Sequence, residues 1–227
     1  IKYLRRDDND FTVRRQMGMS NIVESDLIPI IEQHCSDDKE LFDRVLRLLV
    51  DLTNPILLHF KEKMPKDTDK QMQFIQLENY LVDYKVAFAS HKKVWLVIGK
   101  HMKKILDIDS QERDVEDELM FERILVLIRN ILHVPIDDSL EKGTDDDKNA
   151  QDLIIENMHQ SSINELLLKM FRSFGEYQYC FHLLEIVSLM MRDQNGEFLA
   201  KSSDENTRDN NKGRSLYEKE QDKRELK

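Results

Sequence analysis

The chain has 227 residues, of which 40% are hydrophobic and 34% are charged, and its formal net charge is −10. Only six glycines and four prolines are present, too few for the many turns of a β-rich fold, and no apolar run reaches the roughly 20 residues of a membrane span. Since a dominant nucleic-acid binder is usually basic, any DNA contact must be local.

The first part of the chain predicts a series of helices. Ser25 and Asp26 signal a helix start, and the next helix opens at Asp38. Its apolar residues recur every three or four positions, as on one buried face; they are Leu41, Val45, Leu48, Leu49 and Leu52. Pro55 ends this helix, because the residue before proline disfavours helical backbone. We assign Leu49 and Leu52 to the core.

The middle of the chain predicts helices over residues 69–88, 92–106 and 119–133. The third is the most apolar and is stopped by Pro135, so we expect it to be central. Its predicted core residues are Ile124, Leu125, Ile128 and Ile131. Asn130 lies among them. We expect it to be buried and bonded to the backbone of an adjoining helix or loop, because an unsatisfied buried amide is costly.

The last third of the chain begins with an acidic loop at residues 137–147. Helices follow over residues 150–160, 163–174 and 177–192, and the final helix adds Leu184 and Val187 to the predicted core. Few apolar residues remain beyond position 200. We therefore expect a helical-repeat domain over residues 1–200 and a polar tail over residues 201–227, disordered or a lone exposed helix.

Two of the predicted helices end in the same way. Residues 47–55 can be laid over residues 127–135, both ending in proline, at an offset of about 80 residues, near twice the armadillo or HEAT repeat length. Residues 184–190 are similar without the proline. Any buried helix shares part of this pattern, but the matched prolines favour an all-α, armadillo/HEAT-like helical-repeat solenoid, in which neighbouring units cover one another's apolar faces.

The sequence contains no convincing catalytic or metal constellation. His182 and Glu185 lie one helical turn apart, near Cys180, but no second cluster completes a ligand set. Residues 107–118 match a calcium loop in part, but Glu112 stands where glycine is required. We expect no enzyme activity and no cofactor. The two cysteines, which lack a paired spacing, favour a reducing compartment such as the nucleus or cytosol.

One charged segment, residues 91–104, carries five lysines and no acid. Such lysines can follow a phosphate backbone, and we assign DNA contacts to Lys92, Lys93, Lys100, Lys103 and Lys104. In a helix, Lys93, Lys100 and Lys104 fall on one side while Trp95, Ile98 and Met102 pack inward. The alternative is an ordinary solvated face, which nearby Asp107 and Asp109 could neutralise.

Five segments, in chain order, resemble the Timeless family: residues 25–29, 47–55, 85–89, 122–135 and 184–195. The most specific are Arg-Asn-Ile-Leu-His-Val-Pro at 129–135 and Arg-Asp-Gln-Asn at 192–195, and the resemblance covers residues 1–200. It implies a non-enzymatic, nuclear scaffold of the replication fork protection complex. Its implied partners are a small Tipin-like protein and the MCM-type replicative helicase, near parental duplex DNA. Its implied roles are fork progression, checkpoint signalling and sister-chromatid cohesion.

Other interpretations remain open. The resembled family has a circadian branch that pairs with a Period-like protein, although Arg-Asp-Gln-Asn and the short acidic loop are closer to the replication branch. Without the family, the residues predict a generic helical interaction scaffold. The chain begins at Ile1 rather than at Met and ends in a polar run, so we also expect a fragment of a larger protein. An enzyme would require clustered titratable groups with shifted pKa values in one pocket.

Overall fold

The computed structural model describes residues 1–135 and 149–192. These residues contain helices and no strand, which confirms the all-α prediction. The chain divides into two units, Ile1–Met190 and Met191–Lys227, and every contact given below lies within the first. The predicted acidic loop at 137–147, the boundary after residue 200 and the predicted polar tail lie outside the described residues.

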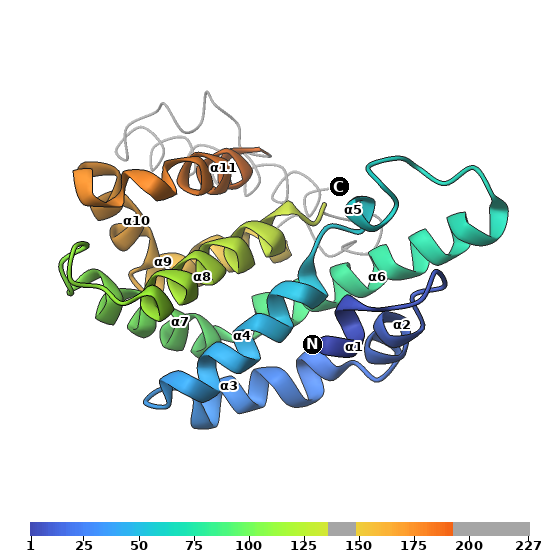
Figure 1. The fold of residues 1–227 in the computed structure, drawn as a ribbon, viewed down its shortest axis with the longest axis horizontal. Helices are drawn as coiled ribbons and strands as arrows, with labels where there is room; N and C mark the ends of the chain where they lie inside the picture. Colours follow the sequence, from blue (N-terminus) through green and yellow to red (C-terminus); the bar gives the residue numbers. More distant parts are fainter. Residues whose placement is uncertain (136–148, 193–227) are drawn as a thin grey trace, which may run out of the picture. The chain divides into compact units, whose positions relative to one another are not determined.

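Figure 1 shows the arrangement of the described helices. In chain order they are α1 (Lys2–Arg5), α2 (Thr12–Met19), the π-helix η1 (Val23–Leu27), α3 (Ile28–His34), α4 (Lys39–Thr53), α5 (Ile56–His59), α6 (Thr68–Ser90), α7 (Lys92–Leu106), α8 (Val115–His133), α9 (Ala150–Gln160), α10 (Ile163–Arg172), the 3-10 helix η2 (Phe174–Tyr179) and α11 (Cys180–Met191).

Side-chain caps define the starts of three of these helices. Asp38, Asp114 and Asn149 each accept the backbone N–H three residues ahead, at 2.9, 2.6 and 2.8 Å respectively, which satisfies a group that the first helical turn leaves unpaired. The cap at Asp114 starts α8 four residues before the predicted position. At their other ends, α4 and α8 stop just before Pro55 and Pro135, as expected.

Other predicted boundaries also differ from the structure. Helical backbone already begins at Val23, and η1 runs directly into α3, so Ser25 and Asp26 lie inside helix. The Ser25 hydroxyl donates to the Asp26 carboxylate and makes no capping bond to the backbone. Further on, α10 ends at Arg172 rather than at residue 174, and the tighter η2 begins at Phe174.

The core forms where α8 contacts α4, α6 and α7, and Figure 1 shows α8 running alongside α4. Six apolar residues that we assigned to the core are at most 1% exposed: Leu49, Leu52, Ile124, Leu125, Ile128 and Ile131. Helix α8 is therefore central, because its apolar residues cover more than one side and meet several neighbouring helices.

Asn130 is only 1% exposed, but its bonds differ from the expected ones. Its amide donates to the Thr53 hydroxyl oxygen at 3.4 Å and to the Asn54 side-chain oxygen at 3.3 Å, and its own oxygen accepts from Arg129 at 3.2 Å. The partners are thus side chains rather than backbone groups. The Thr53 hydroxyl donates to the Leu49 carbonyl, which leaves its oxygen free to accept from Asn130 where α4 ends.

The core assignment on α11 was wrong for one residue and incomplete for the other. Leu184 is 57% exposed and Val187 is half-buried, whereas Leu183 and Ile186 are buried. Helix α11 is apolar on most sides, so its sequence has no single stripe that identifies the inward face. The packing of α11 selects a stripe one position earlier than predicted.

Buried cations cap the C-terminal ends of α4 and α8. Arg14 donates to the carbonyls of Asp51 and Leu52 at 2.7 and 3.1 Å, and Lys85 donates to the carbonyl of Val134 at 2.6 Å. A cation at this end satisfies unpaired carbonyls and opposes the negative end of the helix dipole. The shared arrangement extends the likeness between the two helix ends, while the solenoid itself stays a prediction.

Candidate nucleic-acid interface on helix α7

One side of α7 is held firmly in the core. Trp95, Ile98 and Met102 are buried, as the spacing predicted, and the Trp95 indole N–H donates to the Phe88 carbonyl at 2.8 Å. A buried indole with a satisfied N–H orients its helix. The rotation of α7 about its axis is therefore set by its packing.

His101 joins α7 to the turn between α3 and α4. Its ring stacks on Phe42 with 4.1 Å between ring centroids, and its Nε2 donates to the Cys35 carbonyl at 2.7 Å. Burial lowers the pKa of His101, so the neutral ring is favoured near pH 7. Burial also raises the pKa of the Cys35 thiol to about 11, which makes this cysteine a packing residue rather than a nucleophile.

The opposite side of α7 carries the five predicted DNA-contacting lysines, all of them exposed. At 100° per residue they fall within roughly one third of the helix circumference, and they extend over about 18 Å of helix axis. We call this surface the α7 lysine face; its residues are Lys92, Lys93, Lys100, Lys103 and Lys104. Leu96, also exposed, lies among them.

An acidic residue of the α3–α4 turn contacts part of this face. The Asp37 carboxylate lies 2.8 Å from Lys100 Nζ and 3.7 Å from Lys104 Nζ, and Lys100 also donates to the Ser36 hydroxyl at 2.8 Å. Asp37 was not among the site residues predicted from the sequence. A charged turn before the Asp38 cap was visible, but nothing in the sequence showed which helix the turn faces.

The two acids near in sequence, which the alternative interpretation allowed to neutralise the face, form other contacts. Asp107 lies 3.7 Å from Lys169 of α10, and Asp109 accepts the backbone N–H of Gln111 at 3.1 Å. Neither makes an ion pair with α7 among the described residues. Lys92, Lys93 and Lys103 likewise have no carboxylate partner within that part of the chain, so the α7 lysine face keeps an open portion.

The possible metal cluster on α11 is not assembled. His182 Nε2 lies 3.8 Å from Glu122 Oε1, and Glu185 Oε2 lies 3.4 Å from Arg129 Nη1. The two side chains therefore make separate contacts with α8. Across residues 1–135 and 149–192, no three metal-ligating side chains come together. Within the same ranges, none of the helices combines the length and apolar character needed to cross a membrane.

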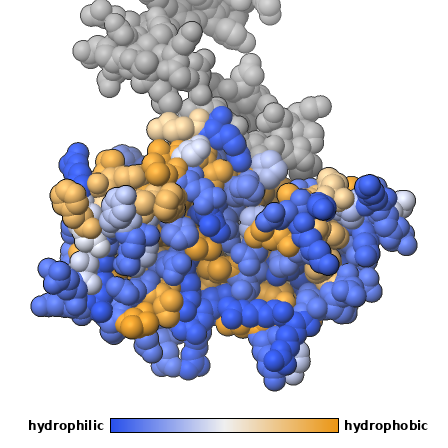
Figure 2. Space-filling model, turned by 45° about the horizontal axis from the view of Figure 1, so that its top comes forward, coloured by the Kyte–Doolittle hydropathy of each residue, from blue (hydrophilic) through white to orange (hydrophobic). Residues whose placement is uncertain are grey.

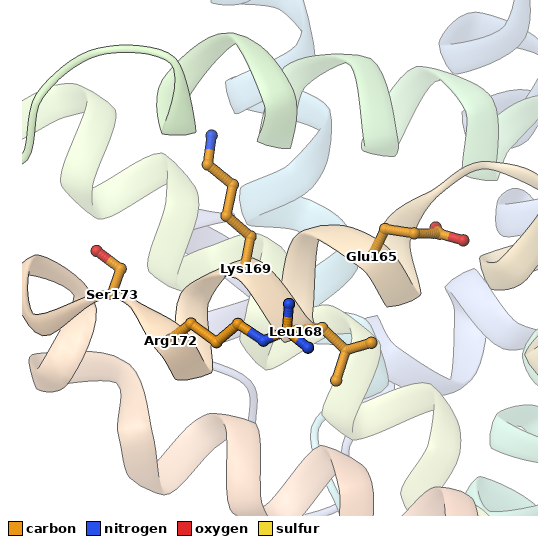
Figure 3. A pocket seen from close by; sticks show the side chains of 5 residues that line it. All are labelled: Glu165, Leu168, Lys169, Arg172 and Ser173. Carbon is orange, nitrogen blue, oxygen red and sulfur yellow. The ribbon is translucent and has the colours of Figure 1, made fainter.

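A second surface feature lies along α10. A hollow of about 540 Å³ is lined by Glu165, Leu168, Lys169, Arg172 and Ser173. Figure 3 shows that the polar ends of Glu165, Lys169 and Ser173 point in different directions. Apolar residues are exposed on the adjoining η2 and α11, and Figure 2 shows such patches separated by hydrophilic surface. Because small-molecule sites need convergent polar groups, the α7 lysine face is the better candidate site.

Comparison with known proteins places these features in a family. A family model described as "Timeless protein" matches residues 1–227. The human protein timeless homolog is 48% identical over 200 residues and the mouse protein 46%, each match covering 88% of this chain. The topoisomerase 1-associated factor 1 of Aspergillus terreus is 25% identical over 223 residues, covering 90% of this chain and 19% of that protein.

The chain spans only 16% of the length of the human and mouse relatives. The family match nevertheless covers every residue of the chain, and nearly half of the aligned positions are identical to the human protein. This chain belongs to the Timeless family.

Proposed function

We propose that this chain is part of a non-enzymatic scaffold of the replication fork protection complex in the nucleus. Membership of the Timeless family supports this proposal, as does the similarity to a fungal protein whose name associates it with topoisomerase 1. The all-helical build of the described residues suits an interaction scaffold. The proposed scaffold supports fork progression, checkpoint signalling and cohesion.

The observation that carries the DNA part of this proposal is the α7 lysine face. Its five exposed lysines lie on one side of a helix whose rotation is set by buried Trp95, and lysine ammonium groups bind phosphate oxygens without reading the bases. The chain as a whole carries a charge of −10, so it should bind DNA weakly by itself. Partners that hold it beside the duplex would raise the effective concentration of these lysines.

The test is DNA binding by the reconstituted complex with its small partner and the helicase. A variant with the open lysines Lys92, Lys93 and Lys103 changed to alanine should bind duplex DNA more weakly at low salt. Its salt slope should fall by up to about 2.7, since each phosphate contact contributes about 0.9. No base-sequence preference should appear.

A matched control removes the same charge from exposed lysines elsewhere. Lys63, Lys66 and Lys70, in and before α6, are all exposed, and their change to alanine should leave the salt slope near the wild-type value. If the two triple variants reduce DNA affinity equally, only net charge matters. The α7 lysine face would then be a solvated surface.

The proposed partners are a Tipin-like small protein and MCM-type helicase subunits. Purification of the full protein from nuclei, followed by identification of the co-purifying chains, tests this directly. Recovery of helicase subunits supports the fork scaffold. Recovery of a Period-like protein without helicase subunits would instead place the chain in the circadian branch.

A further inference from the structure

The turn between α3 and α4 places a carboxylate directly on the α7 lysine face. Asp37 follows Ser36 in this turn, and it contacts Lys100 at 2.8 Å and Lys104 at 3.7 Å. Since Lys100 also donates to the Ser36 hydroxyl at 2.8 Å, its ammonium group has two partners from one turn. These are the same ammonium groups that a bound phosphate would use.

The rest of the protein holds this turn in position. On one side of Asp37, the Cys35 carbonyl accepts from buried His101 of α7 at 2.7 Å. On the other side, Asp38 caps α4 by accepting the Leu41 N–H at 2.9 Å. The backbone carrying Asp37 is thus anchored at both flanks, so little ordering is required before its carboxylate meets the lysines.

The contact itself is exposed and therefore reversible. The Asp37 side chain is 82% exposed, and the side chains of Lys100 and Lys104 are 42% and 52% exposed. Exposed ion pairs are weak and are screened by salt. A phosphate backbone brought close to α7 can displace Asp37, but it must first compete with it.

We propose that Asp37 is an internal competitor for phosphate, which occupies Lys100 and Lys104 and leaves Lys92, Lys93 and Lys103 as the open portion of the α7 lysine face. This inference rests on the proposed DNA contact. Its consequence is selectivity: a polyanion that meets the protein alone finds only the open lysines. DNA held in place by the assembled complex gains the other two by displacing the carboxylate.

Other charges near the face contribute less to this competition. At the start of α7, Glu32 lies 3.3 Å from His91. Beyond its end, Asp107 lies 3.7 Å from Lys169. Among the described residues, Asp37 is the carboxylate that forms ion pairs with the lysines of the face.

The test is Asp37→Asn in the reconstituted complex, with DNA affinity measured across a range of salt concentrations. Release of one or two weak ion pairs should tighten binding about two- to tenfold at low salt. For the protein without its partners, in which Asp37 keeps Lys100 and Lys104 from phosphate, the salt slope should steepen by about 0.9 to 1.8, since one or two further phosphate contacts form. Asp69→Asn, in the exposed first turn of α6, removes the same charge elsewhere and should reproduce neither change.

A second pair of variants tests whether the gain in DNA affinity depends on Lys100 and Lys104. With Lys100 and Lys104 both changed to alanine, the addition of Asp37→Asn should give no further gain. If Asp37→Asn and Asp69→Asn increase affinity equally, the effect is long-range charge and the competitor model is wrong. If Asp37→Asn has no effect while loss of the open lysines weakens binding, this inference fails and the proposed DNA contact survives. If loss of the open lysines also has no effect, the DNA contact itself fails.

One readout needs no DNA. The hydrogen bond from Lys100, followed by its charge, lowers the pKa of the Asp37 carboxyl. Carboxyl titration by NMR should therefore show a lower pKa for Asp37 in the wild type than in the variant lacking both lysine side chains. Equal pKa values in the two proteins would overturn the contact on which the inference depends.

Discussion

Removal of the Glu176 carboxylate should be among the most damaging single changes in this protein. Glu176 of η2 forms a two-bond pair with Arg113, from the segment before α8: Nη1 lies 2.8 Å from Oε2, and Nη2 lies 2.6 Å from Oε1. The two side chains are only 2% and 5% exposed. The Arg113 Nε also donates to the carbonyls of Ile105 and Ile108 at 3.0 and 3.1 Å, so the guanidinium cannot move to water without breaking bonds at the end of α7.

The magnitude follows from this burial. Glu176→Ala leaves a buried guanidinium without its counter-charge, which costs about 3–5 kcal/mol. With a urea m-value of about 2–3 kcal/mol/M, the unfolding midpoint should fall by about 1–2.5 M. Helical circular dichroism followed through a urea titration measures this shift.

Two comparisons decide whether the reasoning is right. The double variant Arg113→Met with Glu176→Leu removes the unpaired charge and should recover much of the lost stability. The carbonyls of Ile105 and Ile108 lose their donor in this variant, which costs about 1 kcal/mol each. Glu165→Ala removes an exposed carboxylate and should cost less than about 0.5 kcal/mol. A Glu176→Ala midpoint equal to that of Glu165→Ala would refute the argument.

Three further outcomes are expected from urea or thermal unfolding. Ile128→Ala, at a fully buried position, should cost about 2–5 kcal/mol, whereas Leu184→Ala on exposed α11 surface should cost less than about 0.5 kcal/mol; equal costs would contradict the burial pattern. Gly99→Ala should lower the melting temperature, because the new Cβ would lie 2.6 Å from the Ser161 carbonyl oxygen. The expected loss of unfolding free energy is about 1–3 kcal/mol, although alanine favours helix over glycine by about 1 kcal/mol. Burial, followed by the charge of a neighbouring arginine, lowers the pKa of His59 to about 4. Its contribution to stability is therefore present above about pH 6.5 and is lost as the pH falls toward 4, because the unfolded state binds the proton first; His59→Leu should flatten this part of the midpoint-against-pH curve, and an unchanged curve would show that His59 is not responsible.

Helix type, order and several ends followed from local features of the sequence. The Asp38 cap and the stop before Pro135 act within one helical turn, so neither depends on the rest of the fold. The central place of α8 followed from composition, since a helix apolar around most of its circumference must be covered on several sides. The α7 lysines could be placed on one side from their spacing and from the inward residues Trp95 and Ile98.

Tertiary packing decided which side of α11 faces inward and which groups Asn130 contacts, neither of which the spacing of residues predicts. On α11, apolar residues occur on most sides, so contact with neighbouring helices had to select Ile186 rather than Leu184 as an inward residue. The partners of Asn130 depend on where α4 ends relative to α8, which no local pattern contains.

The same distinction applies to the candidate site. Five lysines without an intervening acid are visible in the sequence, and they are exposed because the opposite side of α7 is apolar. Which of these lysines form ion pairs is not visible in the sequence. Asp37 contacts Lys100 from 63 positions away, whereas Asp107, which is near in sequence, lies beside Lys169 instead. Charges interact through space over a few ångströms, so the sequence determined the composition of the α7 lysine face, and only the packing of α3 against α7 decided which of its lysines remain open.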